Sequence, residues 1–117
     1  MLFIFKTFCF LFNSMVSPEI KRLKDKTGIE MLWVFILSLL KKKSSHSYLL
    51  RKQIEKEFDF LPGEVTVYVV MYKLKSRSYV SSKRDENKVV YSITKKGNTL
   101  LKEAEKILKE RNKKIFG

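Results

Sequence analysis

The segment Val65–Val80, VTVYVVMYKLKSRSYV, interleaves Thr and Tyr hydroxyls with Lys and Arg side chains. These groups donate hydrogen bonds to phosphates and to base edges, so the chemistry they suit is nucleic-acid binding. Val, Thr and Tyr favour a β-strand, whereas Val67, Val70, Met71 and Leu74 form an apolar stripe at helical spacing. As a strand, neither face is cleanly polar; as a helix, one face is free to touch a partner.

The sequence offers few residues that could support catalysis or bind a metal ion. The chain has a single cysteine, Cys9, and a single histidine, His46, which are too few for a zinc site or an internal disulfide. No Ser/His/acid or Cys/His set at a suitable spacing and no Gly-rich phosphate loop is visible. We therefore predict a protein that is not an enzyme, binds no metal or cofactor, and works in a reducing compartment such as the cytoplasm.

Charge points to a polyanionic partner. The chain of 117 residues carries a net charge of +13, with 20 lysines and 5 arginines. Such an imbalance destabilises a compact domain slightly and benefits binding to nucleic acid or to anionic membranes. Because lysine supplies a general positive field and arginine reads phosphate and guanine bidentately, affinity is better supported than base-specific recognition. The length allows one domain with a modest core.

The head of the chain, residues 1–14, differs from the rest: it holds five of the nine phenylalanines and one charge, Lys6. It is shorter than the roughly 20 apolar residues of a membrane-spanning helix, and it lacks the basic start and cleavage site of a signal peptide. Three interpretations stay open. In the first, the segment consists of extra residues ahead of a true start at Met15, or of residues without order. In the second, it forms a helix that packs on the domain or on a partner. In the third, it is a targeting segment. The fold prediction leaves this segment out.

Several helix signals follow. Ser17–Glu19 combines a hydroxyl cap, a proline and an acid, as at a helix start. Thr27–Glu30 matches the T-x-x-E capping box and predicts the start of a second helix. Residues 31–40 are apolar except for one serine and predict a buried core helix, which the basic run 41–43 closes.

The next two helices are predicted on either side of a break. Ser45 or Ser47 can cap the first of them. Its apolar positions repeat at helical spacing: Leu49, Leu50, Ile54 and Phe58. Pro62 and Gly63 then interrupt the chain. For the segment after the break we predict a helix, because intrinsic propensities differ by only about tenths of a kcal/mol per residue and packing overrides them.

A β-hairpin and a final helix complete the chain. Tyr79–Lys83 and Lys88–Ile93 are predicted strands, with residues 84–87 as a four-residue turn in which Asn87 adopts the left-handed conformation. Thr94 caps a last helix that runs to about Arg111. The fold class is therefore mainly α with a small β-hairpin. The short turn at residues 59–63 joins the two helices on either side of the break, as a helix-turn-helix needs. With the core helix before them and the hairpin after them, the predicted fold is a winged helix-turn-helix, and we expect the last helix to be a C-terminal dimerisation helix.

Three motifs follow one another between about residues 31 and 101. LLKKKSSHSYLLRKQIEKEF contains a His-x-Tyr pair at His46 and Tyr48. PGEVTVYVVMYKLKSRSYV contains a Thr-Val-Tyr triplet at residues 66–68, followed by Leu74, and KVVYSITKKGNTLL contains Ile-Thr-Lys-Lys-Gly at residues 93–97. In the order and spacing of these motifs the sequence resembles the PadR-like transcriptional regulators. In that family the His-x-Tyr pair opens the second helix, the triplet lies on the recognition helix, and a Leu-Thr-x-x-Gly motif enters the last helix.

The sequence departs from the family pattern at four positions. Glu64 and Val65 are extra residues between Pro-Gly and the Thr-Val-Tyr triplet. Val69 replaces a usual proline, and Ser78 replaces the usual glycine between the recognition helix and the wing. The chain also ends after one terminal helix, as in the short branch of the family that lacks a large effector domain.

The third helix of a winged helix-turn-helix, here the predicted helix after Gly63, enters the major groove. Hydroxyls on this helix can donate to base edges, and Val69 can meet a thymine methyl. Predicted DNA-binding residues lie on this helix, on the second helix and on the wing: Thr66, Tyr68, Val69, Tyr72, Lys73, Tyr48, Arg51, Lys52, Lys83, Arg84 and Lys88. Tyr68 is equally interpretable as a packed aromatic. His46 is better explained as a cap or surface residue than as a phosphate contact.

The last helix carries an apolar stripe that fits either the core or a dimer interface. We predict a dimer interface, made of Leu100, Leu101, Ala104, Ile107, Leu108 and Trp33. A two-fold dimer would place its two recognition helices about 34 Å apart, one turn of DNA.

Three segments are thus expected: an apolar extension at 1–14, a winged-helix DNA-binding domain at 15–93 and a dimerisation helix at 94–117. The expected function is a sequence-specific, double-stranded DNA-binding regulator, a cytoplasmic homodimer; repression is implied by the resemblance alone. No residue demands a small-molecule effector, and a membrane partner is disfavoured. The alternative is a membrane-surface or protein/RNA-binding adaptor that uses the Phe-rich head and the winged helix.

Overall fold

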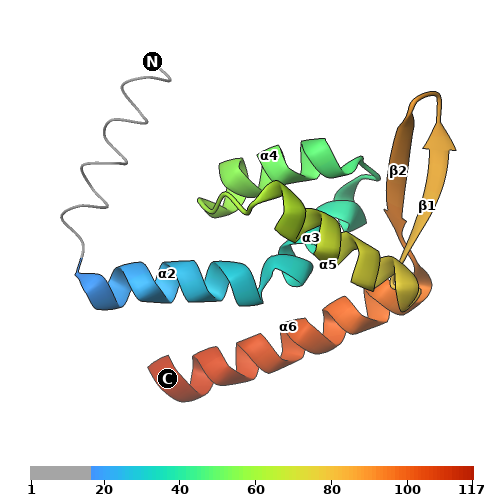
Figure 1. Ribbon diagram of the computed structural model, residues 1–117. Coiled ribbons are helices and arrows are strands. Elements are labelled where there is room, and N and C mark those ends of the chain that lie inside the picture. The colour runs from blue at the N-terminus through green and yellow to red at the C-terminus, as the bar shows by residue number, and fades with distance from the viewer. Residues whose placement is uncertain (1–16) are drawn as a thin grey trace.

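The computed structural model describes residues 17–117 and contains, in that range, five helices and one two-stranded hairpin. Figure 1 shows them in chain order. The elements are α2 (Pro18–Glu30), α3 (Leu32–Lys42), α4 (Ser47–Phe58), α5 (Glu64–Ser76), β1 (Val80–Asp85), β2 (Lys88–Ile93) and α6 (Lys95–Phe116). The predictions made for residues 1–14 and for a start at Met15 lie outside the described residues.

The core is built around α3, which packs against α4, α5, α6 and β2. The central cluster of buried apolar side chains comes from four elements: Leu32, Ile36, Leu37, Leu39 and Leu40 on α3, Leu50 and Ile54 on α4, Val67, Met71 and Leu74 on α5, and Val80 on β1. The rings of Phe35 and Phe58 stack with their centroids 4.1 Å apart, which fixes α4 against α3. The predicted buried helix is confirmed.

The predicted capping box is wrong, although the helix start ahead of it is confirmed. The hydroxyl of Ser17 accepts from the backbone N–H of Ile20 and caps α2. The chain stays helical through Thr27, whose hydroxyl donates to the carbonyl of Leu23 at 2.5 Å instead of capping. Within α2, Gly28 lets the ring of Phe60 pack closely against the helix, because a Cβ at this position would stand 2.6 Å from that ring.

The cap of α4 also differs from the prediction. His46 is the cap residue, and its Nδ1 accepts from the N–H of Leu49 at 3.4 Å. Ser45 is buried and forms an isolated bridge with Tyr91 through two backbone hydrogen bonds of 3.0 and 2.8 Å. The backbone of Ser45 thus belongs to the bridge with the hairpin, and α4 begins after it, at Ser47, with His46 as its cap. The interpretation of His46 as a cap-region residue is confirmed.

The wing is a tighter hairpin than predicted. Strands β1 and β2 pair antiparallel from Val80 opposite Ile93 to Asp85 opposite Lys88. The opposite charges of this last pair favour the extra pairing, which leaves only two residues in the turn. Glu86, with φ of 55°, takes the left-handed conformation predicted for Asn87.

The last helix is longer than predicted and ends at Phe116 instead of near Arg111. Its cap is confirmed, because the Thr94 hydroxyl accepts from the N–H of Gly97 at 3.0 Å. Further along, Lys109 contacts Glu105 at 2.7 Å, and this ion pair lowers the pKa of the Glu105 carboxyl. The three-helix unit of α3, α4 and α5 with its β-hairpin confirms the winged helix-turn-helix.

Candidate nucleic-acid interface

Residues 65–76 of the Val-, Thr- and Tyr-rich segment belong to helix α5, whose outward face is rich in exposed aromatic and polar side chains. Val67, Met71 and Leu74 are buried and hold one side of the helix against the core. On the other side, Tyr68 and Tyr72 are 66% and 68% exposed. Thr66, Val69 and Lys73 are exposed as well. A packed role for Tyr68, which the sequence left open, does not fit this exposure.

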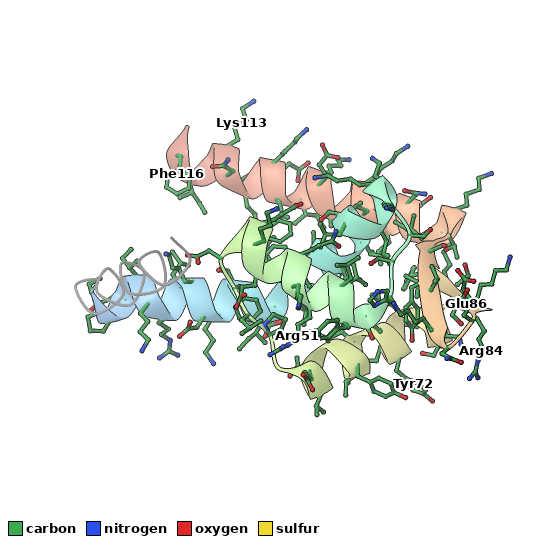
Figure 2. All side chains as sticks on the ribbon, turned by 90° about the horizontal axis from the view of Figure 1, so that it is seen from above. Arg51, Tyr72, Arg84, Glu86, Lys113 and Phe116 are labelled. Atoms are coloured by element: carbon green, nitrogen blue, oxygen red, sulfur yellow. The ribbon has the colours of Figure 1, made fainter. Side chains whose placement is uncertain are left out.

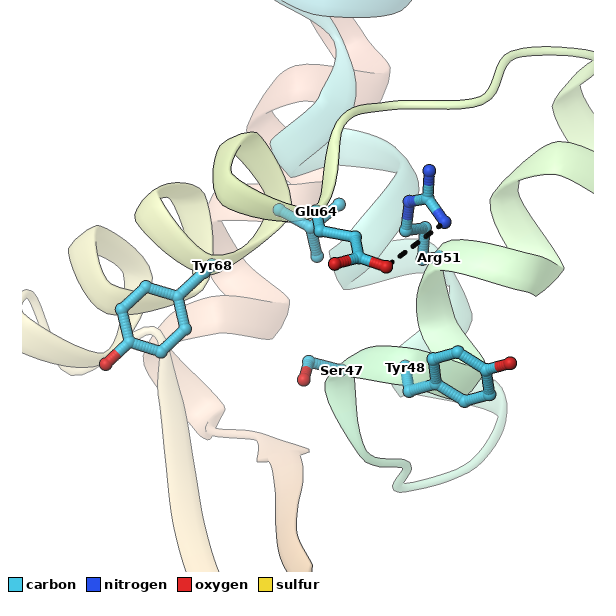
Figure 3. Close-up of a pocket in the computed structure, with 6 residues that line it drawn as sticks. Ser47, Tyr48, Arg51, Glu64 and Tyr68 are labelled. Carbon is cyan, nitrogen blue, oxygen red and sulfur yellow. Dashed lines mark ion pairs between the residues drawn. The ribbon is translucent and has the colours of Figure 1, made fainter.

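The first turn of α4 lies beside this face. Tyr48 is exposed, and the ammonium of Lys52 stands 4.7 Å from the centre of its ring. Figure 3 shows Ser47 and Tyr48 across from Tyr68, with Glu64 and Arg51 between the two helices. Together with Val67 these residues line a cavity of about 210 Å³ that is open to solvent. The two helices thus present one continuous surface.

Arg51 is held by the protein itself. Its Nε donates to the carbonyl of Pro62 at 2.7 Å, and its Nη1 lies 3.9 Å from a carboxylate oxygen of Glu64. The Arg51 side chain is only 25% exposed, whereas that of Glu64 is 78% exposed. A phosphate contact by Arg51, as predicted, would have to compete with these two partners.

Glu64 was not among the DNA-binding residues predicted from the sequence. One signal for it was present, because Glu64 is an extra residue relative to the pattern of the resembled family.

The wing extends the same surface. Lys83, Arg84 and Lys88 are exposed on the hairpin, next to the acidic Asp85 and Glu86 at its tip. In Figure 2, Tyr72 and Arg84 lie along one edge of the molecule, and Lys113 and Phe116 lie at the opposite edge. Tyr72 of α5 and Arg84 of the wing, both predicted to bind DNA, therefore lie on the same side of the molecule.

The predicted dimer residues divide into two groups. Leu100, Leu101 and Trp33 are partly buried against the core, and Ala104 is 8% exposed. Ile107 and Leu108 are 51% and 39% exposed. The first half of the stripe thus packs within the chain, and the second half remains available.

Further exposed apolar residues, which were not among the predicted dimer residues, lie on α2 and at the end of α6: Ile20, Leu23, Ile29, Ile115 and Phe116.

Residues 17–117 contain neither a metal-binding cluster nor a helix that could span a membrane. No group of three His, Cys, Asp or Glu side chains in this range could hold a metal ion. Across the same range, none of the helices combines the length and the apolar character that crossing a membrane requires.

Comparisons with known proteins agree with this geometry. Residues 36–103 match the family described as the transcriptional regulator PadR-like family. The structure of a transcriptional regulator from Clostridium thermocellum is similar, with a TM-score of 0.72, 25% identity, and coverage of 77% of this chain and 94% of that chain. No curated protein matches the sequence.

Two further structures support the fold alone. A PadR family transcriptional regulator from Eggerthella lenta has a TM-score of 0.71 at 22% identity, covering 91% of this chain and 93% of that chain. A winged-helix DNA-binding protein from STIV has a TM-score of 0.60 at 18% identity, covering 67% and 86%.

Proposed function

The chain belongs to the PadR-like family of transcriptional regulators, and on that premise we propose that it is a sequence-specific repressor that binds double-stranded DNA as a homodimer. The observation that carries this proposal is the exposed face of α5. Two tyrosines that are about two-thirds exposed stand next to Thr66 and Lys73 on a helix whose other side is anchored in the core. A monomer gains little stability from exposing large aromatic side chains, so a contact role explains them better.

The proposed mechanism divides the contacts by chemistry. Helix α5 lies in the major groove, where Thr66, Tyr68 and Tyr72 hydrogen-bond to base edges or phosphates and Val69 meets a thymine methyl. Lys73 adds a charge contact to this helix. Basic side chains of the wing, together with Tyr48 and Lys52 of α4, contact the backbone and supply most of the affinity. With Asp85 and Glu86 at its tip, the wing lies along phosphates and does not insert deeply into the minor groove.

The dimer is proposed from the apolar side chains that the monomer leaves exposed. Ile107 and Leu108 continue the stripe of α6 beyond the core, and Ile20 and Leu23 on α2 are 47% and 59% exposed. Burying such side chains between two copies stabilises the pair by roughly 25 cal/mol per Å² of apolar surface. Two copies of α5 then face the DNA, which allows recognition of two half-sites one turn apart.

Repression is the simplest outcome of this arrangement. A dimer that covers two neighbouring major grooves of a promoter excludes the polymerase by occupancy and needs no catalytic group. A protein with this role works where the DNA is, and we place it in the cytoplasm. No small-molecule effector is assigned.

The test is fluorescence anisotropy with a labelled duplex from the upstream region of its own gene and a scrambled duplex of the same composition. We expect Kd values of roughly 10⁻⁴–10⁻⁶ M for the scrambled duplex at physiological salt and binding at least about a thousandfold tighter for the specific one. Tyr68→Ala should remove most of the difference while leaving the circular dichroism spectrum unchanged. Equal affinity of the wild-type chain for both duplexes would contradict a sequence-specific regulator of its own promoter.

A further inference from the structure

An acidic side chain lies at the N-terminal end of the proposed recognition helix, α5, in a strongly basic protein. Glu64 is the first residue of α5, and its side chain is 78% exposed. The N-terminal residues of a recognition helix are the ones that reach base edges in the major groove. Of the side chains that line the cavity between α4 and α5, Glu64 is the acid. Its position on the proposed DNA-facing side therefore requires a physical reason.

A carboxylate restricts what the start of α5 can approach. It repels phosphate oxygens, so it lowers affinity for the DNA backbone. It also repels the acceptors that guanine and thymine present in the major groove, whereas the N4 amino group of cytosine donates a hydrogen bond to it. Adenine offers an amino donor as well, but its N7 acceptor lies beside that donor. Cytosine is thus the base that a carboxylate at this place accepts best.

Arg51 limits where the Glu64 carboxylate can go. The Arg51 guanidinium is tied to the α4–α5 turn through its Nε bond to the Pro62 carbonyl, 2.7 Å long. Its Nη1 faces Glu64 at 3.9 Å, as the dashed line in Figure 3 shows. The positive charge of Arg51, whose position is fixed by Pro62, attracts the Glu64 carboxylate toward the α4 side of the start of α5. Arg51 would therefore act by positioning Glu64 and not by contacting a base itself.

We infer that Glu64 is a specificity-determining residue that selects cytosine at one position of the operator, with Arg51 as its positioning residue. This inference rests on the proposed function, since it names the base that the same surface reads. Selection of a base by Glu64 differs from a purely structural role of this residue in the helix. An acid in the first turn of a helix is also stabilised by the helix dipole, and that effect involves no base.

The experiment measures base preference with the full-length chain and a duplex library whose central segment is randomised. The bound fraction is sequenced for the wild-type chain, Glu64→Gln, Arg51→Lys and Glu86→Gln. The last variant is the matched control, because it makes the same change of charge and size at the exposed wing tip. Thermal melts verify that each variant is folded.

The expected result is a change at one position of the bound sequence. Wild-type chains should prefer cytosine there by about tenfold over guanine or thymine. Glu64→Gln should shift that position toward adenine, whose amino group and N7 match a glutamine amide. Arg51→Lys should weaken the cytosine preference at the same position and leave other positions as they are. Glu86→Gln should bind all duplexes more tightly with an unchanged profile.

Two results would overturn the inference, and they are distinguishable. If the wild-type chain shows a clear base profile that Glu64→Gln leaves unchanged, Glu64 has only a structural role, and the proposed regulator stands. If the wild-type chain enriches no sequence at all, the proposed sequence-specific function fails, and the inference fails with it.

Discussion

Ser78 and Glu86 adopt left-handed backbone conformations at the two ends of β1. Ser78, with φ of 66°, joins α5 to the wing, and Glu86, with φ of 55°, turns the hairpin. Glycine reaches this region without steric cost, whereas other residues pay roughly 1–2 kcal/mol for it. Ser78 occupies the position where the resembled family usually has glycine, so the departure from the pattern leaves the conformation in place and adds strain.

Ser78→Gly should therefore stabilise the protein. Relief of the left-handed strain, partly offset by the greater freedom of glycine in the unfolded chain, should raise the free energy of unfolding by about 0.5–1 kcal/mol. Urea unfolding followed by circular dichroism measures it. The matched control is Ser81→Gly in β1, which has no left-handed strain and should lose about 0.5–1 kcal/mol. Equal effects of the two substitutions on the free energy of unfolding would contradict the proposal that Ser78 is strained.

Gly97 is needed for a close approach between α6 and the wing. A Cβ at this position would collide with the backbone carbonyl of Tyr79 and stand 2.8 Å from a side-chain carbon of Ile93. Gly97→Ala should lower the free energy of unfolding by about 2–3 kcal/mol, because a backbone carbonyl cannot move aside easily. Gly63→Ala is the control, since its nearest atom is the Thr66 hydroxyl at 3.5 Å. Similar melting temperatures for the two variants would count against this packing.

At the scale of elements, α5 shows where packing overrides composition. Its Val, Thr and Tyr residues favour a strand, yet Val67, Met71 and Leu74 lie at helical spacing and are buried against α3. That spacing could be read from the sequence, and so could the order of helices and hairpin. The cap at His46 could not be predicted from the sequence, because it depends on the pairing of Ser45 with Tyr91, a contact across 46 residues of chain.

The wing should contribute phosphate contacts and little sequence preference. Arg84→Ala should weaken binding to specific and scrambled duplexes by similar factors and reduce the slope of log K against log salt by about one. Anisotropy titrations across a salt series measure the slope. Lys113→Ala removes the same charge at the opposite edge of the molecule and should leave the slope unchanged (Figure 2). A loss confined to the specific duplex would instead assign Arg84 to base recognition.

At the scale of the whole molecule, the dimer prediction concerns surface that one chain does not cover. Ile107→Glu puts a charge on an apolar position that is 51% exposed in the single chain. If two copies meet there, burial of an unpaired carboxylate should raise the dimer dissociation constant by about a hundredfold or more. Size-exclusion chromatography with light scattering gives the mass.

The control for this variant is Val65→Glu, which is 76% exposed at the start of α5 and should not change the mass. A wild-type chain that is monomeric at micromolar concentration, or an unchanged dimer in Ile107→Glu, would contradict the proposed interface.

The division of the α6 stripe marks the limit of prediction from sequence. Leu100 to Leu108 repeat as one apolar face, but the chain covers it unevenly: Leu101 is partly buried against the core, Ala104 is buried, and Ile107 is 51% exposed. Periodicity identifies a face and cannot say which helix covers it. The same holds for Arg51, whose charge suggested a phosphate contact and whose guanidinium is engaged by Pro62 and Glu64.

The most direct test of the account is a hydroxyl-radical footprint of the full chain on the duplex upstream of its own gene. A two-fold dimer with one α5 in each major groove should protect two patches on one face of the DNA, about 10–10.5 base pairs apart from centre to centre. Tyr68→Ala should abolish both patches at the same protein concentration. A single patch would contradict the dimer, and uniform protection or none would contradict specific binding at this site.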